Sequence, residues 1–455
     1  MGSIDYSSGF RIPMTVQVGE HPREDSPIEI EMDFSQALRQ LKLDGEFDIN
    51  SIRLLEMDGE GRVTNRVPVQ FEPGEGFAPH GRATGKLSWI LDGWTPPYGE
   101  RNYALFFDIL ESGAKQPLEY GTGVTFRRFN LDPMQDRAMS VAVGGQFFTT
   151  YNYGWKHSSL YKPFFCPLLG PSGKSVIQNG EFPGSLRGHY WHRGLFVAHQ
   201  LVNGYTFWEE WDGEMRWTGR DGKLYTRLAG RILHQEFVQL VEGPVSGYFL
   251  ERNRWRKPDG SDVLEELRGV RIYNLPADRR IVDLRLILKP IDEDVVLGKT
   301  PYQMLACRLA GRMNVTSVTT NYNLRNYEDW ELRAMGSGGL VVDSEGRINV
   351  DPSEPAEEVR AKWMDHSGPA DGGWEGVAIF DSPVNERYPT AWLNWNLMTM
   401  GPSFTRGEEF VIPCDGALTL SYRVYVHKGD AWMGKVAQKF ADYANPVTVT
   451  LGDLV

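Results

Sequence analysis

The sequence predicts a mostly β protein, with an N-terminal β-sandwich, a large antiparallel β-supersandwich and one C-terminal helix. Runs of alternating or β-branched residues recur along the 455-residue chain, and 49 Gly and 27 Pro residues separate them. Helical periodicity is scarce. Hydrophobic residues make up 41% of the chain and charged residues 24%. This is the composition of a globular protein with a large core.

The strand assignments follow from residue alternation and from turn signals. The clearest strands are Met14–Val18, Tyr103–Phe107, Val270–Tyr273, Ile281–Leu288 and Leu418–Val426. Asp-Gly pairs, which favour tight hairpin turns, recur between such runs. We therefore expect antiparallel sheets that are joined by hairpins.

Two segments have helical spacing, and one domain boundary is visible. Phe34–Leu41 suits a short helix, and Asp430–Tyr443 carries a stripe of apolar residues that starts at Trp432. Residues 1–125 are interpreted as a self-contained sandwich. Residues 126–455 contain no further linker, which predicts a single double-sheet body that carries the functional site.

Charge and cysteine content limit the partners and the compartment. The chain has 48 Lys and Arg against 60 Asp and Glu, a net charge of −12, which disfavours nucleic acid. It has no apolar run long enough for a membrane span and no signal-peptide pattern at its start. We expect a cytoplasmic protein, with a secreted origin left open. Cys166, Cys307 and Cys414 are widely spaced, so we expect three small buried side chains and no disulfide framework.

Histidine and tryptophan gather in one part of the chain. Five of the nine histidines lie between residues 157 and 234, and the densest stretch is Gly188–Trp211. Aromatic faces stack on sugar rings, while Arg, Asn, Glu and His bind hydroxyl and carboxylate groups. This mixture of residues is typical of a carbohydrate site, although aromatic-rich β cores look similar.

The histidines can be interpreted in three ways. The spacing of His189, His192 and His199 matches no standard zinc pattern, so no metal is expected. As acid–base groups they would titrate near neutrality, and Arg193 could stabilise an anion beside them. The alternative is that they only satisfy hydrogen bonds in the core. The sequence has no nucleotide-binding loop, nucleophile elbow or EF-hand loop, so no cofactor is expected.

Carboxylates and later polar segments supply further candidates. Glu209 and Glu210 alternate sides on a strand, as do Glu265 and Glu266, so at most one of each pair can face a pocket. We expect Glu209 and Glu265 to be solvated. Two strand-to-loop segments, 361–369 and 379–392, place polar groups where β scaffolds carry function. Turn formation explains their Asp and Asn residues equally well.

Several motifs along the chain resemble those of the PmoA-labelled family, and they occur in the same order. Pro163–Gly173 reads PFFCPLLGPSG, and a second run resembles the family's H-P-H-H-R-G-L and V-N-G-x-D-F-W elements. The residues that match this second run are His189, His192, Arg193, Gly194, Leu195, Ala198, His199, Val202, Asn203, Gly204, Phe207 and Trp208. Later matches are Ile232 and His234, Glu266 and Arg268, Tyr273–Pro276, Trp363, Asp365, Ser367–Pro369 and Ile379–Asn385. The resemblance covers roughly residues 135–430.

This sequence departs from the family pattern at four places. Trp191 replaces a histidine, Gln200-Leu201 replaces Gly-Asp, Lys299–Tyr302 replaces a Lys-Glu-Gly-Gly stretch, and a late histidine is lost at Trp392-Leu393. The family label suggests a methane oxygenase subunit, which we reject because a membrane copper enzyme needs apolar spans. The resemblance implies instead a galactose-mutarotase-like supersandwich and a carbohydrate context.

Three hypotheses follow from the residues and the resemblance. The first is a carbohydrate-active enzyme of the glycoside hydrolase type, which cleaves a glycosidic bond. Its candidate substrates are uronate-containing or plant-derived oligosaccharides, and β-elimination by a lyase is the alternative reaction. Its expected catalytic residues are His192, His199, His234, Glu266 and Asp365. Its expected substrate-binding residues are His189, Arg193, Asn203, Trp208, Lys299, Trp363 and Asn385. The second hypothesis is a sugar epimerase or mutarotase, and the third is a non-catalytic glycan-binding protein. The expected partner is a carbohydrate, and an oligomer stays possible.

Overall fold

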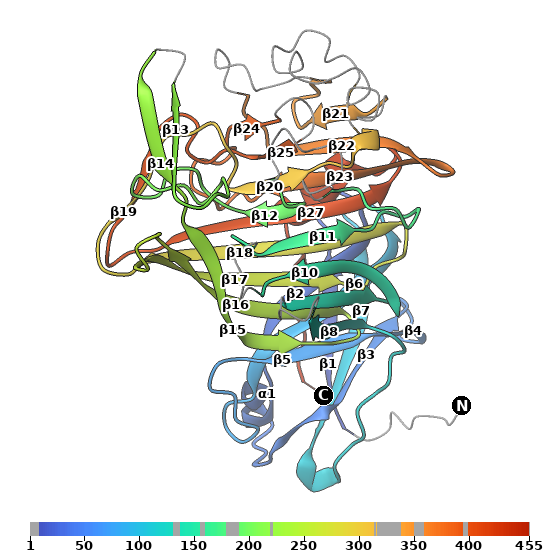
Figure 1. Ribbon diagram of the computed structural model, residues 1–455. Helices are drawn as coiled ribbons and strands as arrows, with labels where there is room; N and C mark the ends of the chain where they lie inside the picture. The colour runs from blue at the N-terminus through green and yellow to red at the C-terminus, as the bar shows by residue number, and fades with distance from the viewer. Residues whose placement is uncertain are drawn as a thin grey trace. The chain divides into compact units, whose positions relative to one another are not determined.

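The structure is a computed structural model (Figure 1). It describes residues 9–130, 137–154, 160–178, 191–218, 222–313, 315, 338–349, 359–394 and 399–454. As predicted, these residues form a mostly β protein, with two α-helices among them. The chain divides into a small and a large compact unit. The small unit comprises Met1–Val124, Gly243–Ser246 and Ala441–Val455, and the large unit comprises Thr125–Glu242 and Gly247–Phe440.

The small unit is a sandwich of two antiparallel sheets. The larger sheet has the order β28 (Thr448–Leu451), β1 (Phe10–Gln17), β7 (Glu100–Ile109), β3 (Phe47–Met57) and β4 (Val63–Val67). The smaller sheet has the order β2 (Arg23–Asp33), β6 (Thr84–Thr95) and β5 (Val69–Pro73). Helix α1 (Phe34–Gln40) follows β2, and the Asp33 carboxylate caps it by accepting from Gln36 N. Its Phe34 ring is buried in the core and stacks on Phe47 with centroids 4.2 Å apart.

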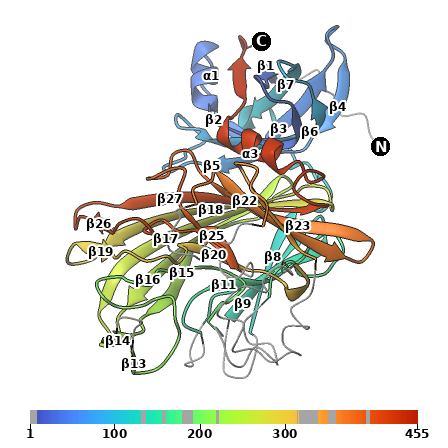
Figure 2. The ribbon, with the colours of Figure 1, turned by 90° about the horizontal axis from the view of Figure 1, so that it is seen from above.

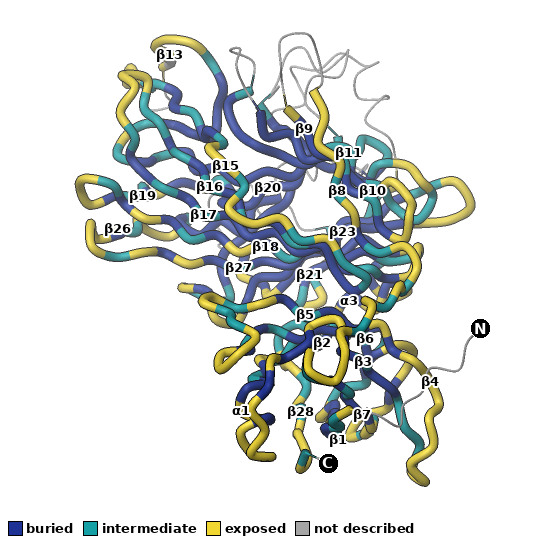
Figure 3. Tube along the Cα trace, turned by 90° about the horizontal axis from the view of Figure 1, so that it is seen from below, coloured by how far each residue is buried: buried dark blue, intermediate teal, exposed yellow. Residues whose placement is uncertain are grey.

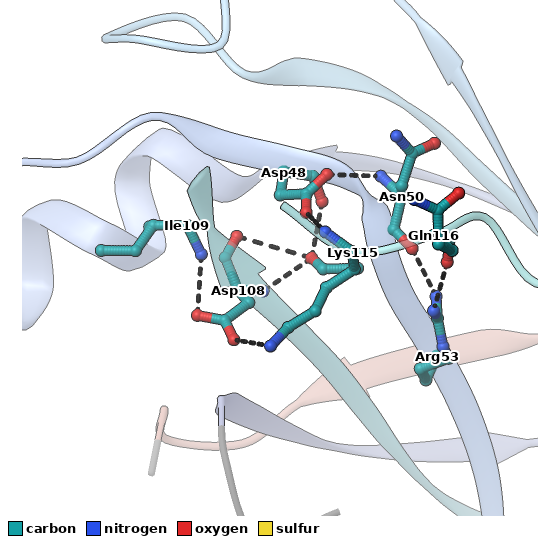
Figure 4. A network of polar contacts seen from close by, with 8 residues as sticks. Asp48, Asn50, Arg53, Asp108, Ile109, Lys115 and Gln116 are labelled. Carbon is teal, nitrogen blue, oxygen red and sulfur yellow. Dashed lines mark hydrogen bonds and ion pairs between the residues drawn. The ribbon is translucent and has the colours of Figure 1, made fainter. Parts of the chain in front are cut away.

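A polar network joins two strands of this sandwich to the segment that leaves it (Figure 4). The ladder between β3 and β7 shifts register between Asp48 and Arg53. The buried Asp48 carboxylate accepts from Asn50 N at 3.0 Å and from Lys115 N at 2.7 Å. Lys115 Nζ also lies 3.4 Å from Asp108 Oδ2. Asp108 Oδ1 accepts from Ile109 N at 2.9 Å. Both buried carboxylates are therefore bonded to backbone N–H groups.

The C-terminal segment differs from the sequence prediction, which placed all of residues 126–455 in one body. Strand β28 pairs with β1, with Met14 opposite Leu451 and Gln17 opposite Thr448. Within the same unit, Arg23 Nη1 lies 3.2 Å from Asp442 Oδ1, and both side chains are buried. The last residues therefore belong to the small unit, because β1 offers them an open strand edge.

The large unit consists of two eight-stranded antiparallel sheets. Sheet I has the order β24 (Trp392–Leu393), β25 (Thr399–Pro402), β20 (Leu305–Arg308), β12 (Leu195–Val197), β11 (Phe164–Leu168), β10 (Gln146–Asn152), β9 (Arg137–Val143) and β8 (Val124–Asn130). Sheet II has the order β15 (Arg231–Val241), β16 (Ser246–Arg256), β17 (Asp262–Tyr273), β18 (Arg279–Pro290), β27 (Leu418–Lys428), β23 (Gly373–Asp381), β22 (Trp363–Ala370) and β21 (Leu340–Asp343). Two ribbons pair β13 (Glu214–Thr218) with β14 (Leu224–Leu228), and β19 (Val295–Leu297) with β26 (Phe410–Ile412). The two sheets form separate layers (Figure 2).

The strand registers define an inner and an outer face of sheet I. Tyr151, Phe165, Leu195 and Cys307 lie opposite one another in turn, so they share one face. That face looks towards sheet II, because the Tyr151 ring packs on Phe249 of β16 at 5.0 Å. The next residues along these strands, Asn152, Phe164, Phe196 and Ala306, form the outer face. Buried residues line the strands of both sheets (Figure 3).

Two details differ from the expectations. Helix α3 runs over Val436–Ala444 and does not include Trp432, which is exposed. Asp430 Oδ1 accepts from Trp432 N and Met433 N, so this stretch is a turn and the helix begins after it. None of the three cysteines forms a disulfide. Cys307 is buried, but Cys414 is exposed and Cys166 is half-buried, so the expectation of three buried side chains was wrong.

Candidate functional site

The outer face of sheet I carries a buried ionic cluster, called here the Lys162 cluster. Lys162 precedes β11, Arg193 precedes β12, and Glu210 lies in the loop after β12. Lys162 Nζ is 2.9 Å from Glu210 Oε1, and Arg193 binds the same carboxylate through Nε at 2.9 Å and Nη2 at 2.5 Å. All three side chains are buried. Two cations therefore share one carboxylate.

A glycine fixes the position of Arg193. Gly194 has φ +72°, and a Cβ there would lie 2.3 Å from Phe165 O. Only glycine allows this backbone geometry so close to β11. The Gly194 carbonyl also accepts from Arg308 N on β20. The Arg-Gly pair therefore turns the chain into β12 and directs the guanidinium onto Glu210.

The charges of this cluster are costly to bury. Taking an ion out of water costs several kcal/mol, and that cost is offset only by close partners. Burial lowers the pKa of Lys162, whereas the Glu210 carboxylate opposes this shift. The Lys162 ammonium also donates to Trp208 O at 2.6 Å, and no described residue accepts its third N–H. Lys162 is thus a buried amine whose charged form is favoured by the carboxylate that it contacts, Glu210, and to a smaller extent by Glu209.

Aromatic rings surround the cluster. The Lys162 ammonium lies 4.9 Å from the centroid of the Phe196 ring. Trp208 packs on Phe196 at 5.1 Å, on Tyr302 at 5.2 Å and on His192 at 5.8 Å. Trp208 Nε1 is buried, and no acceptor for it lies within the described part of the chain. His192, Arg193 and Trp208, all predicted from the sequence, are therefore brought together here.

Lys162 and Glu210 were not among the predicted site residues. A lysine inside the aromatic and proline-rich run Tyr161–Pro167 was the signal that could have identified it, because charge is rarely placed in such a run. Glu209 was expected to be solvated, but it is buried and points away from Glu210. It accepts from Gln200 Nε2 at 2.7 Å and from the Thr206 hydroxyl, and Arg227 lies 3.7 Å away. Adjacent carboxylates thus serve two separate sets of partners.

Three other predicted residues near this loop have different surroundings. His199 is buried, accepts from Leu201 N at Nδ1 and bonds the Thr405 hydroxyl through Nε2, and burial lowers its pKa to about 4. Asn203 stabilises a turn, because its carbonyl oxygen accepts from Val296 N at 2.7 Å. Lys299 is exposed. The structure does not bring these three side chains to the Lys162 cluster.

A second set of polar groups, called here the His234 chain, lies between the two sheets. His234 on β15 contacts Glu251 on β16 through Nδ1 at 2.6 Å, and the Tyr151 hydroxyl of β10 donates to the other oxygen of Glu251. Arg268 on β17 donates to the Tyr151 hydroxyl at 3.0 Å and to Glu266 Oε1 at 2.6 Å. The predicted residues His234 and Glu266 are therefore the two ends of one hydrogen-bonded chain.

The remaining predicted residues lie elsewhere on sheet II. Asp365 bonds His427 Nε2 at 2.8 Å, and both are buried. Asp365 lies opposite Ala378 on β23, and Ala378 lies opposite Tyr425 on β27. Followed across to β17, this register places Asp365, His427 and Trp363 on the face of sheet II opposite to that of Glu266. Asn385 bonds Asp381 and the Ser421 backbone, which ties a turn to β27. His189 lies outside the described residues.

Neither a metal site nor a membrane-spanning helix emerges from the described residues. No three His, Cys, Asp or Glu side chains in these ranges lie close enough together to hold a metal ion. No helix among them combines the length and the apolar character that crossing a bilayer requires.

Comparisons with known proteins give one family and a distant structural likeness. Residues 138–441 match the model of a family described as a family of unknown function (DUF6807). No curated protein matches the sequence. A crystal structure described as a protein in glycosyl hydrolase family 38 from Enterococcus faecalis has a TM-score of 0.42 at 10% identity, over 97% of this chain and 47% of that one. This chain thus spans about half of that protein, and so distant a likeness carries no information about activity.

Proposed function

The chain belongs to a family of unknown function (DUF6807), and we propose that it is a carbohydrate-active enzyme that cleaves a glycosidic bond in an acidic saccharide. The observation that carries this proposal is the Lys162 cluster, in which an ammonium and a guanidinium are buried among aromatic rings. Buried ions are costly to keep, and perturbed charges of this kind concentrate at functional sites.

The chemistry of the cluster suits a sugar with a carboxylate. Arg binds carboxylates with two parallel hydrogen bonds, and Lys adds a point charge. Trp208 offers an indole N–H that has no acceptor among the described residues, and sugar hydroxyls are acceptors for such donors. Tryptophan rings also provide apolar surface for the C–H faces of a sugar. A uronate-containing oligosaccharide combines all of these groups.

Two reactions break such a glycosidic bond. Hydrolysis, the reaction expected from the sequence, needs two carboxyl groups about 5–10 Å apart around the bond. Elimination needs a base next to the uronate and cations that stabilise the enolate-like intermediate. Glu209 and Glu210 are each bonded to other protein groups, whereas Lys162 and Arg193 are cations in place. This arrangement makes elimination the second candidate, and one assay separates the two.

The decisive experiment is incubation of the purified protein with glycosides and uronate-containing oligosaccharides. Mass spectrometry and ultraviolet absorbance would follow the products. Products that gain the mass of water establish hydrolysis, and an ultraviolet-absorbing product without that gain establishes elimination. Binding without turnover of any substrate would contradict the proposal and favour a glycan-binding protein.

Variants test whether the Lys162 cluster is the site. Lys162→Met and Arg193→Lys are each expected to lower kcat/KM for acidic substrates at least about tenfold, since each removes one charged hydrogen bond of about 1.5–3 kcal/mol. Lys174→Met is the matched control, because Lys174 is exposed and pairs only with exposed Asp371. Circular dichroism checks that each variant folds. Unchanged kcat/KM in folded Lys162 and Arg193 variants would rule out this cluster.

A further inference from the structure

The His234 chain is a second buried array of charges, distinct from the Lys162 cluster. Its members come from β10, β15, β16 and β17, and Glu251, Glu266 and Arg268 are fully enclosed between the sheets. Trp255 Nε1 donates to Glu266 Oε2 at 2.7 Å, which closes the inner end. His234 stands at the other end and is the least buried of the residues named in this array. It is therefore the member of the array that is best placed to exchange a proton with a group outside it.

The inner partners determine which nitrogen of His234 carries the proton. Glu251 accepts three hydrogen bonds, from His234, from the Tyr151 hydroxyl and from Asn253 Nδ2 at 2.9 Å. Burial works against the charge of Glu251, but the His234 contact and the Arg268 charge outweigh it and lower its pKa. An ionised carboxylate can only accept, so His234 must donate through Nδ1. Its Nε2 is then the basic nitrogen.

The outer side of the ring leaves Nε2 available. Tyr153 and Phe237 pack against the imidazole with centroids 4.6 and 4.7 Å away. Among the described residues none bonds to Nε2, and this nitrogen is not enclosed as the ring nitrogens of His366 are. Among the described residues, Glu251 contacts the ring directly, and Tyr151 and Arg268 lie behind Glu251. On the other side Tyr153 packs against the ring, and the charges of Arg128 and Arg137 act on Tyr153. A carboxylate that orients a histidine whose other nitrogen is unbonded is the arrangement of a general acid–base group.

The chain is also linked to the Lys162 cluster. Ile232, two residues before His234 on β15, donates its N–H to Tyr161 O at 2.8 Å, and Lys162 is the next residue. The Tyr161 hydroxyl donates to Asp212 at 2.5 Å, in the loop that carries Glu210. The same backbone segments therefore position both sets of groups.

We propose that His234 is an acid–base group of this enzyme, with Glu251 as the residue that positions it. The inference rests on the proposed function, because the reaction that His234 would assist is the cleavage of a glycosidic bond. In elimination, Nε2 takes the proton of the C–H bond beside the uronate carboxylate, the electron pair of that bond forms the C=C bond, and the glycosidic C–O bond breaks with its pair on the oxygen. In hydrolysis, Nε2 takes a proton from water, the water oxygen bonds to the anomeric carbon, and the glycosidic C–O bond breaks in the same way. In both reactions the imidazolium keeps its Nδ1 proton hydrogen-bonded to Glu251 and gives its Nε2 proton to the departing sugar oxygen.

Nuclear magnetic resonance of histidine-labelled protein tests the imidazole without any substrate. His234 is expected to carry its single proton at Nδ1 and to leave Nε2 without one, because Nδ1 faces the Glu251 carboxylate. Glu251→Gln removes the charge that holds this proton at Nδ1 and is expected to raise the population of the tautomer that is protonated at Nε2. A wild-type ring that holds its single proton at Nε2 would overturn the proposal.

Chemical modification gives a matched comparison within the same protein. Diethyl pyrocarbonate reacts with an unprotonated imidazole nitrogen that it can reach. His427 is also paired with a carboxylate, but Asp365 holds its Nε2 and its Nδ1 lies 3.3 Å from Lys428 O. His234 is expected to react at least about tenfold faster than His427, because its Nε2 is unbonded and His427 is enclosed. Equal rates for the two would count against an available Nε2.

Kinetics then tests the role in catalysis. His234→Gln is expected to lower kcat about 100-fold or more with little change in KM, and Glu251→Gln to move the pH dependence of kcat. A folded His234→Gln variant that keeps kcat within about threefold would overturn the proposal. If the wild type turns over no saccharide although His234 carries its proton at Nδ1 and reacts faster than His427, the proposed function fails, whereas the assignment of Nε2 as the available nitrogen holds.

Discussion

At the scale of single residues, two neighbouring carboxylates on β17 differ in their burial and in their hydrogen-bond partners. Glu266 is fully buried and binds Arg268 and Trp255, whereas Glu265 is partly exposed and pairs with Arg254 at 2.7 Å. Glu266→Ala is expected to cost about 3–5 kcal/mol, because it leaves a buried guanidinium unpaired. Glu265→Ala is the control, with an expected cost below about 1 kcal/mol. Urea unfolding measures both, and equal costs would contradict the buried network.

Residue patterns predicted part of the site. The alternation rule correctly placed Glu265 and Glu266 on opposite faces, and the histidine-rich stretch led to His192, Arg193 and Trp208. Partners that come from distant strands were out of reach, since nothing local connects Lys162 to Glu210 or His234 to Tyr151. Predicted residues with ordinary turn functions, such as Asn385, look the same in sequence as residues that bind a substrate.

At the scale of elements, β5 and β6 approach so closely that one position admits no side chain. A Cβ at Gly85 on β6 would lie 2.4 Å from Glu72 O and 2.6 Å from the Phe71 ring. Gly85→Ala is therefore expected to push the two strands apart and to cost about 1–3 kcal/mol. Gly59→Ala is the control in the same unit, because a Cβ there has nothing within 4 Å. Thermal unfolding compares the two, and a harmless Gly85→Ala would contradict this register.

Strand β22 carries a buried histidine that links stability to pH. Burial lowers the pKa of His366 to about 4, below its ordinary value of 6.5. The unfolded chain therefore binds this proton more readily between these values, so the folded state loses stability as pH falls from 6.5 towards 4. The loss is about 3 kcal/mol for this group. We expect His366→Gln to reduce the pH dependence of the unfolding free energy in that range, and parallel curves for variant and wild type would contradict it.

At the scale of the whole molecule, strand alternation and hairpin signals were sufficient to predict a mostly β fold with a sandwich and a double-sheet body. The path of the chain was not predictable in the same way. The pairing of Met14 with Leu451 joins residues from opposite ends of the sequence, and periodicity carries no information about which distant edge a strand joins. For that reason the C-terminal segment was assigned to the wrong body.

The pairing of the C-terminal strand β28 with β1 gives a testable prediction about stability. Strand β28 covers the edge of β1, and Val449 packs against the core of the small unit. Deleting residues 447–455 is expected to cost about 3 kcal/mol, through lost ladder bonds and lost apolar burial, and leaves the Arg23–Asp442 contact in place. Hydrogen exchange of the β1 amides that face β28 should speed up, because they become open to water. Val449→Thr is the control that removes apolar burial but keeps the ladder, so it should lower stability without exposing those amides. Unchanged exchange in the deletion variant would show that β28 does not hold the edge of β1 in solution.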